Sequence, residues 1–68
     1  MTKIALLKGL LKENGDTYSD FANIIERSKT TVLSRISGKT EFTRDELEKI
    51  LQYYNLSEDR FLTIFFNK

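Results

Sequence analysis

The 68-residue sequence has no cysteine, no histidine and no proline, and it has only three glycines. The absence of cysteine and histidine excludes disulfide bonds, thiol chemistry and imidazole metal ligands. No apolar run approaches the roughly 18 residues of a membrane-spanning helix, and no signal peptide with a small-residue cleavage site is present. We therefore expect a cytoplasmic protein that does not contact a membrane. Its stability must come from an apolar core. In a chain this short, association with a second copy is a further source of stability.

Positive charge is concentrated in the middle of the chain, although the formal net charge is only +1. Segment 27–44 contains a single acid, Glu41, and its basic residues are Arg27, Lys29, Arg35, Lys39 and Arg44. A near-neutral protein with one basic face is typical of nucleic-acid binding. The alternative is a solvated basic surface that binds no ligand.

Apolar residues recur at spacings of three and four along the whole chain, which predicts helices rather than strands. Breaks at Asn14-Gly15, Ser37-Gly38 and 55–57 divide this pattern. The predicted helices cover about 3–13, 17–25 and 28–37, a fourth begins at Thr43 and includes Tyr54, and a fifth, apolar helix covers 57–67. The fold class is therefore all-α, with five short helices in one domain over residues 1–68.

Start signals support this division. The predicted N-cap residues, whose hydroxyls can accept from the backbone of the first turn, are Thr17, Ser28, Thr43 and Ser57. The acids of the fourth helix, such as Asp45, Glu46 and Glu48, are expected mainly on its exposed arc, and Glu46 also completes a capping box with Thr43. The residues expected to face inward on the first four helices are Leu6, Leu7, Leu10, Leu11, Phe21, Ala22, Ile25, Val32, Ile36, Leu47, Ile50, Leu51 and Tyr54.

The order of residues from 17 to 39 resembles the helix-turn-helix of phage Cro and repressor proteins. Phe21-Ala22 stands where that family has an apolar residue followed by alanine. Ser28 stands at the family's cap position, and Val32 at its buried position. The letters ISGK at 36–39, EFT at 41–43 and FLTIFF at 61–66 are similar to those of small phage-encoded regulators.

Two positions depart from the family pattern. Glu26 occupies the turn position that usually holds glycine, and Arg27 occupies the next position, which is usually apolar. Either Glu26 adopts the left-handed conformation, at a cost on the order of 1–2 kcal/mol, or the turn has a different shape. Arg27 is then expected to point outward.

The resemblance implies a lambda-repressor-like bundle in which the helices over about 17–37 form a helix-turn-helix. It also implies a Cro-like repressor of a phage or prophage genetic switch, which binds a palindromic operator in double-stranded DNA and blocks access to a promoter. A short regulator of this kind and the N-terminal domain of a larger repressor are both compatible with the sequence.

The second helix of such a pair lies in the major groove, and its N-terminal residues reach base edges. The predicted base contacts are Lys29, Thr30, Thr31, Leu33 and Ser34. Lys29 can donate to guanine, and Leu33 is either a thymine-methyl contact or an isolated surface leucine. The predicted phosphate contacts are Tyr18, Arg27, Ser28, Arg35, Lys39 and Arg44.

The C-terminal stretch from 61 to 66 contains five large apolar residues. We expect Phe61 and Phe65 to complete the core, and Leu62 and Phe66 to form a twofold homodimer. The dimer would place two recognition helices about 34 Å apart, one turn of DNA. The alternative is a monomer in which all five residues belong to the core.

Catalysis is not expected, because Ser28 and Ser34 have no histidine or cysteine partner and no glycine-rich phosphate loop is present. No cofactor and no small-molecule substrate are expected for the same reasons. The rival function is a protein-binding module, such as an antirepressor or adaptor, that uses the aromatic C-terminal helix.

Overall fold

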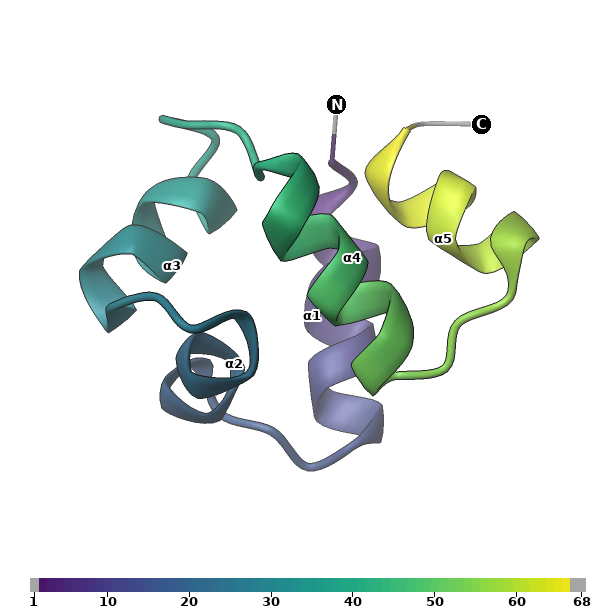
Figure 1. The fold of residues 1–68 in the computed structure, drawn as a ribbon, viewed down its shortest axis with the longest axis horizontal. Helices are drawn as coiled ribbons and strands as arrows, with labels where there is room; N and C mark the ends of the chain where they lie inside the picture. Colours follow the sequence, from purple (N-terminus) through teal and green to yellow (C-terminus); the bar gives the residue numbers. More distant parts are fainter. Residues whose placement is uncertain (1, 67–68) are drawn as a thin grey trace.

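The computed structural model describes residues 2–66 and contains five helices and no strand within that range (Figure 1). The helices are α1 (Ile4–Glu13), α2 (Tyr18–Ile25), α3 (Lys29–Ile36), α4 (Arg44–Tyr53) and α5 (Glu58–Phe65). The all-helical class and the five predicted segments are confirmed. Residue 67, the end of the predicted fifth helix, lies outside the described residues. Within the described range no helix is both long and apolar enough to cross a membrane.

Side-chain caps determine where four of the helices begin. Thr17, Ser28, Thr43 and Ser57 each accept a hydrogen bond from the backbone N–H three residues further on, as predicted. The first helix lacks such a cap. Its preceding residue, Lys3, instead donates its backbone N–H to the carbonyl of Ile64 at 2.6 Å, which ties the start of α1 to α5.

All five helices contribute to one apolar core. α2 packs against α3 and α4, and α1 packs against α5. The buried apolar residues are Leu7, Leu10, Leu11, Phe21, Ala22, Ile25, Val32, Ile36, Ile50, Ile64 and Phe65. In Figure 1, α3 and α5 lie at opposite ends of the longest axis of the molecule, along which the Cα atoms extend 28 Å.

The loop between α3 and α4 is held to this core by Phe42. Its ring meets that of Phe21 edge-on, with centroids 6.1 Å apart, and that of Phe65 edge-on at 5.5 Å. Edge-to-face pairs of this kind stabilise by about 0.5–1.5 kcal/mol beyond the area they bury. The loop that carries Lys39 and Thr40 therefore has a fixed position relative to α3.

Several predicted core positions are less buried than expected. Leu6 is 42% exposed, because the buried arc of α1 runs through Leu7, Leu10 and Leu11 and leaves Leu6 at its edge. The residues of the fourth helix and its C-cap that were expected inside but are only half-buried are Leu47, Leu51 and Tyr54. Ile50 alone on that apolar stripe is fully enclosed.

Candidate functional site

One side of α3 presents a largely polar, solvent-facing surface. Lys29, Thr30 and Leu33 are exposed, and Leu33 keeps 45% of its surface accessible. Thr31 and Ser34 are half-buried on the same helix. The α3 face also borders a shallow hollow of about 390 Å³, whose lining residues are Thr30, Leu33, Ser34, Ser37 and Lys39. Three of the five predicted base-contacting residues, Thr30, Leu33 and Ser34, thus line this concave surface.

Two predicted contact residues are engaged with each other at the start of α3. The Ser28 hydroxyl accepts from the Thr31 backbone N–H at 3.2 Å and donates to Thr31 Oγ1 at 3.1 Å. Because the Ser28 proton is used in this way, its side chain stabilises the helix start. The Thr31 hydroxyl, which accepts from Ser28, keeps its own proton for a further acceptor.

Glu26 determines the shape of the turn between α2 and α3. Its φ of 58° and ψ of 46° place it in the left-handed region, the first of the two alternatives that the sequence left open. The next residue, Arg27, donates its backbone N–H to the Ala22 carbonyl at 2.9 Å, which closes the end of α2. The turn therefore keeps a compact form despite having no glycine.

Glu46 is fully buried, which corrects the expectation that it lies on the exposed arc of α4. One carboxylate oxygen accepts from Arg35 Nε at 2.9 Å and from the Thr43 backbone N–H at 3.1 Å. The other accepts from Arg27 Nε at 2.9 Å and from a terminal nitrogen of Arg35 at 3.0 Å. A single carboxylate thus joins the α2–α3 turn, the end of α3 and the start of α4.

The protonation of Glu46 follows from these contacts. Burial alone would raise the pKa of Glu46, but hydrogen bonds from Arg35 and Thr43 and the charges of Arg35 and Arg27 outweigh it, so the pKa lies below its ordinary value. The hydrogen bond with Glu46 in turn raises the pKa of Arg35. The carboxylate is therefore ionised at neutral pH and both arginines are held by it.

This arrangement bears directly on two predicted phosphate contacts. Arg35 is only 14% exposed in its side chain, and Arg27 is 35% exposed. An outward-pointing Arg27 was expected for a differently shaped turn; with Glu26 left-handed, the Arg27 guanidinium instead binds Glu46. A phosphate contact from either arginine would compete with its bonds to Glu46. The bonds of Arg27 and Arg35 to Glu46 support a different role for these arginines, which is to position α3.

The remaining predicted phosphate contacts lie on the surface. Lys39 is exposed in the loop after α3, and Arg44 at the start of α4 is 93% exposed in its side chain, 3.5 Å from Glu48. Neither cation is buried against the body of the protein. Both are therefore accessible to a ligand that approaches α3.

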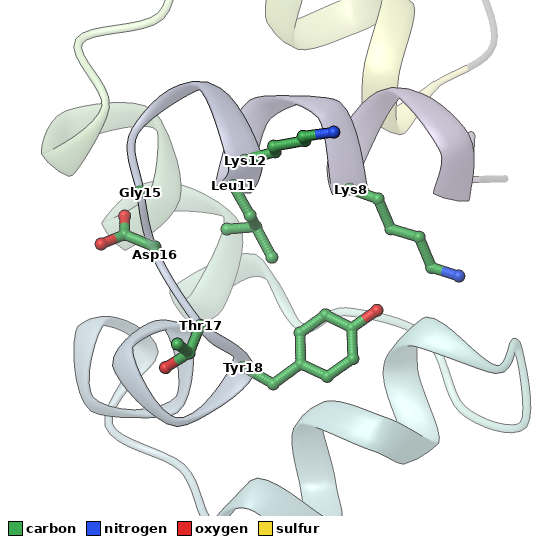
Figure 2. Close-up of a pocket in the computed structure, with 7 residues that line it drawn as sticks. All are labelled: Lys8, Leu11, Lys12, Gly15, Asp16, Thr17 and Tyr18. Carbon is green, nitrogen blue, oxygen red and sulfur yellow. The ribbon is translucent and has the colours of Figure 1, made fainter.

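Tyr18 lies at the start of α2 beneath α1. With two lysines of α1 it borders an open hollow of about 490 Å³, whose lining residues are Lys8, Leu11, Lys12, Gly15, Asp16, Thr17 and Tyr18. Figure 2 shows the Tyr18 hydroxyl and the Lys8 ammonium on the same side of this hollow, with the Asp16 carboxylate directed the other way. Sequence reasoning missed the two lysines. Their i, i+4 spacing on the outer side of α1 is the signal that could have identified them.

The C-terminal helix carries the other predicted site. Phe65 is buried and Phe61 half-buried, whereas Leu62 is half-buried and Phe66 is 47% exposed. A groove of about 620 Å³ lies between α4 and α5, lined by Leu51, Gln52, Asn55, Leu56, Glu58, Phe61 and Leu62. This end of the molecule therefore exposes apolar surface far from α3.

No protein-family model, curated protein or solved structure matches this chain. Among residues 2–66 no group of acidic side chains is arranged to hold a metal ion. Function must therefore be inferred from the geometry of the chain itself.

Proposed function

We propose that this protein is a cytoplasmic, sequence-specific DNA-binding regulator of transcription, with α2 and α3 as a helix-turn-helix and α3 in the major groove. A lambda-repressor-like bundle and a Cro-like role in a phage or prophage switch complete the proposal. The observation that carries it is the solvent-facing side of α3, with Lys29, Thr30 and Leu33 exposed together beside the loop that carries Lys39. An α-helix with such a face fits the width of the major groove.

Each exposed residue of α3 suits a particular part of a base pair. Lys29 donates to guanine O6 or N7, and Thr30 reaches either a base acceptor or a thymine methyl group. Leu33 offers an apolar contact to a thymine methyl from the border of the hollow. Thr31 and Ser34, each with one hydroxyl proton to donate, complete the proposed set of base contacts.

Phosphate contacts would flank this face on both sides. On one side we assign Lys39 and Arg44, which are exposed cations beside the C-terminal end of α3. On the other we assign Tyr18 with Lys8 and Lys12, which share a hollow at the N-terminus of α2. Arg27 and Arg35 contribute through Glu46, by fixing α3 between these two flanks.

We propose further that Leu62 and Phe66 form a twofold homodimer. Two recognition helices one DNA turn apart must each lie about 17 Å from the twofold axis. A distance of this size fits within the 28 Å extent of the molecule, at whose opposite ends α3 and α5 lie (Figure 1). An axis near α5 is therefore compatible with binding to a palindromic operator, whose occupation would block a promoter.

The test is selection of binding sites from random double-stranded DNA, followed by affinity measurements at two salt concentrations. Lys29→Ala and Thr30→Ala are each expected to weaken binding to the selected site by about 1–3 kcal/mol and to relax specificity at one position. Lys39→Ala is expected to weaken binding to all sequences equally and to lower the salt slope by about one phosphate. Arg60→Ala, a cation on α5 at the far end, is the matched control and should leave DNA binding unchanged.

A protein-binding module, such as an antirepressor or adaptor, is the second candidate, favoured by the exposed Phe66 and the apolar groove beside α5. It predicts binding that depends on the C-terminal helix and ignores substitutions on α3. If the selection enriches no DNA sequence, the proposal of a DNA-binding regulator is rejected and the protein-binding module remains.

A further inference from the structure

A chain of hydrogen bonds leads from the buried Glu46 to the exposed side of α3. Arg35 binds Glu46 through Nε and one terminal nitrogen, and its other terminal nitrogen donates to Thr40 Oγ1 at 2.6 Å. Thr40 Oγ1 lies 2.9 Å from Ser34 Oγ. Arg35 is fixed by the carboxylate, so the position of the Thr40 hydroxyl is fixed as well.

The chemistry of the arginine sets the direction of this chain. A guanidinium has only donors, so Thr40 Oγ1 accepts from Arg35 and keeps its own proton available to donate. A hydroxyl that accepts from a cation is polarised and becomes a better donor. This polarisation favours Thr40 as the donor to Ser34 Oγ, an arrangement that directs the proton of Ser34 to another partner.

The surroundings of Ser34 show where that proton can go. Ser34 is half-buried and borders the hollow that Thr30, Leu33 and Lys39 also line. Its backbone carbonyl already accepts from the Lys39 N–H at 3.0 Å and from the Ser37 hydroxyl at 3.1 Å, which holds the loop against the end of α3. Ser34 therefore presents one donor, at a fixed place, to whatever occupies the hollow.

We propose that Thr40 is a positioning residue that makes Ser34 a hydrogen-bond donor, and that Ser34 thereby selects a base with an acceptor at its major-groove edge. Such acceptors are guanine O6 and N7, adenine N7 and thymine O4. This inference rests on the proposed DNA-binding function. It adds that Thr40, which does not touch the DNA, determines specificity at the base pair read by Ser34.

The experiment is a double-mutant cycle on the full chain with the selected DNA site and its single-base-pair variants. Ser34→Ala and Thr40→Val are each expected to lower affinity for the best site about five- to tenfold, the effect of one lost hydrogen bond. Both should abolish the preference at the same base pair. Thr40→Val in the Ser34→Ala background should have no further effect on affinity, because the hydroxyl that Thr40 positions is then already absent.

Two controls separate positioning from folding. Thr40→Ser keeps the hydroxyl and should bind DNA as the wild type does. Thr63→Val removes a hydroxyl that donates to the Asp59 carbonyl on α5, and it should leave DNA binding unchanged. If Thr40→Val acted only by weakening the loop, it would lower DNA affinity equally in the wild-type and Ser34→Ala backgrounds.

Three results would overturn the inference: a Thr40→Val variant with wild-type affinity, equal losses in both backgrounds, or a loss that is the same for all base pairs. The last would mean that Ser34 contacts a phosphate. Each of these requires a wild-type protein that binds a selected site. A wild type that selects no site would instead reject the proposed function itself.

Discussion

The Tyr54 hydroxyl donates to Asp16 Oδ2 at 2.7 Å and so joins the end of α4 to the loop that precedes α2. Burial, followed by this hydrogen bond and the negative charge of Asp16, raises the pKa of Tyr54 above its ordinary value. The protonated hydroxyl is therefore the form that the folded state favours. Its contribution to stability is present below about pH 10, the ordinary tyrosine pKa, and is lost as the pH rises above that value.

Tyr54→Phe is therefore expected to lower the free energy of unfolding at pH 7 by about 1.5–3 kcal/mol, the typical contribution of a hydrogen bond to a charged group. Between pH 9 and pH 11 the variant should lose less stability than the wild type. Only the wild type has the Tyr54 hydroxyl, whose stabilising contribution decreases as the pH rises. Urea unfolding at the three pH values measures both effects. Tyr53→Phe is the control, since Tyr53 is 61% exposed, and equal pH dependence of Tyr54→Phe and wild type would contradict the assignment.

Glu46→Gln is expected to destabilise the fold by about 3–5 kcal/mol. The substitution leaves the half-buried guanidiniums of Arg27 and Arg35 without their counter-charge, and breaking a buried ion pair by removing one partner has a cost of this size. Glu48→Gln, at an exposed position beside Arg44, should change stability by less than about 0.5 kcal/mol. Denaturant unfolding at neutral pH compares the two variants.

The same carboxylate makes stability depend on acid. Because the pKa of Glu46 is lower in the folded protein than in the unfolded chain, its contribution is present above about pH 4.3 and is lost as the pH falls through the folded value. Wild type should therefore lose more stability than Glu46→Gln between pH 6 and pH 2. Parallel stability curves for the two proteins would show that the carboxylate is not ionised preferentially in the fold.

Glu26→Gly is expected to stabilise the protein by about 1 kcal/mol. Glu26 has a φ of 58°, a conformation that is unfavourable for a residue with a Cβ and accessible to glycine. The greater freedom of glycine in the unfolded chain offsets part of the gain. Glu26→Ala keeps the strain while it removes the charge, so thermal unfolding of the two variants separates backbone strain from electrostatics; equal melting temperatures would contradict the explanation.

Phe66→Glu is expected to convert a dimer into a monomer in sedimentation experiments at high micromolar concentration, with Leu62→Glu acting similarly. A charge at a self-associating apolar surface would be desolvated on both subunits. Leu33→Ser is the matched control, because it alters an exposed leucine of α3 at the opposite end of the molecule. A monomeric wild type at the same concentration would refute the proposed dimer.

The helices could be predicted from the sequence because their boundaries depend on local contacts. Thr17 and Ser57, for example, cap the backbone only three residues away, and the hydroxyl residue at the cap is visible in the sequence. The exposed side of α3 could be predicted for a similar reason, since Val32 and Ile36 mark its buried side by their spacing.

The burial of Glu46 could not be predicted in this way. Its capping box with Thr43 is local and was expected, but that role is compatible with an exposed side chain. The burial of Glu46 depends on the guanidiniums of Arg35 and Arg27, which lie 11 and 19 residues away in the sequence and neutralise its carboxylate. Such encounters follow from the packing of α2, α3 and α4, which helical periodicity alone does not specify.

The hydrogen bond from the Lys3 N–H to the Ile64 carbonyl brings the beginning and the end of the described chain to the same place. The described ends of the chain therefore both lie at α5, at the opposite end of the molecule from α3 (Figure 1). Labels placed there would leave the solvent-facing side of α3 unobstructed. Immobilising the protein by a label at this end keeps α3 accessible to nucleic acid in solution, and it places the label on the side of the molecule that carries the proposed dimer residues Leu62 and Phe66.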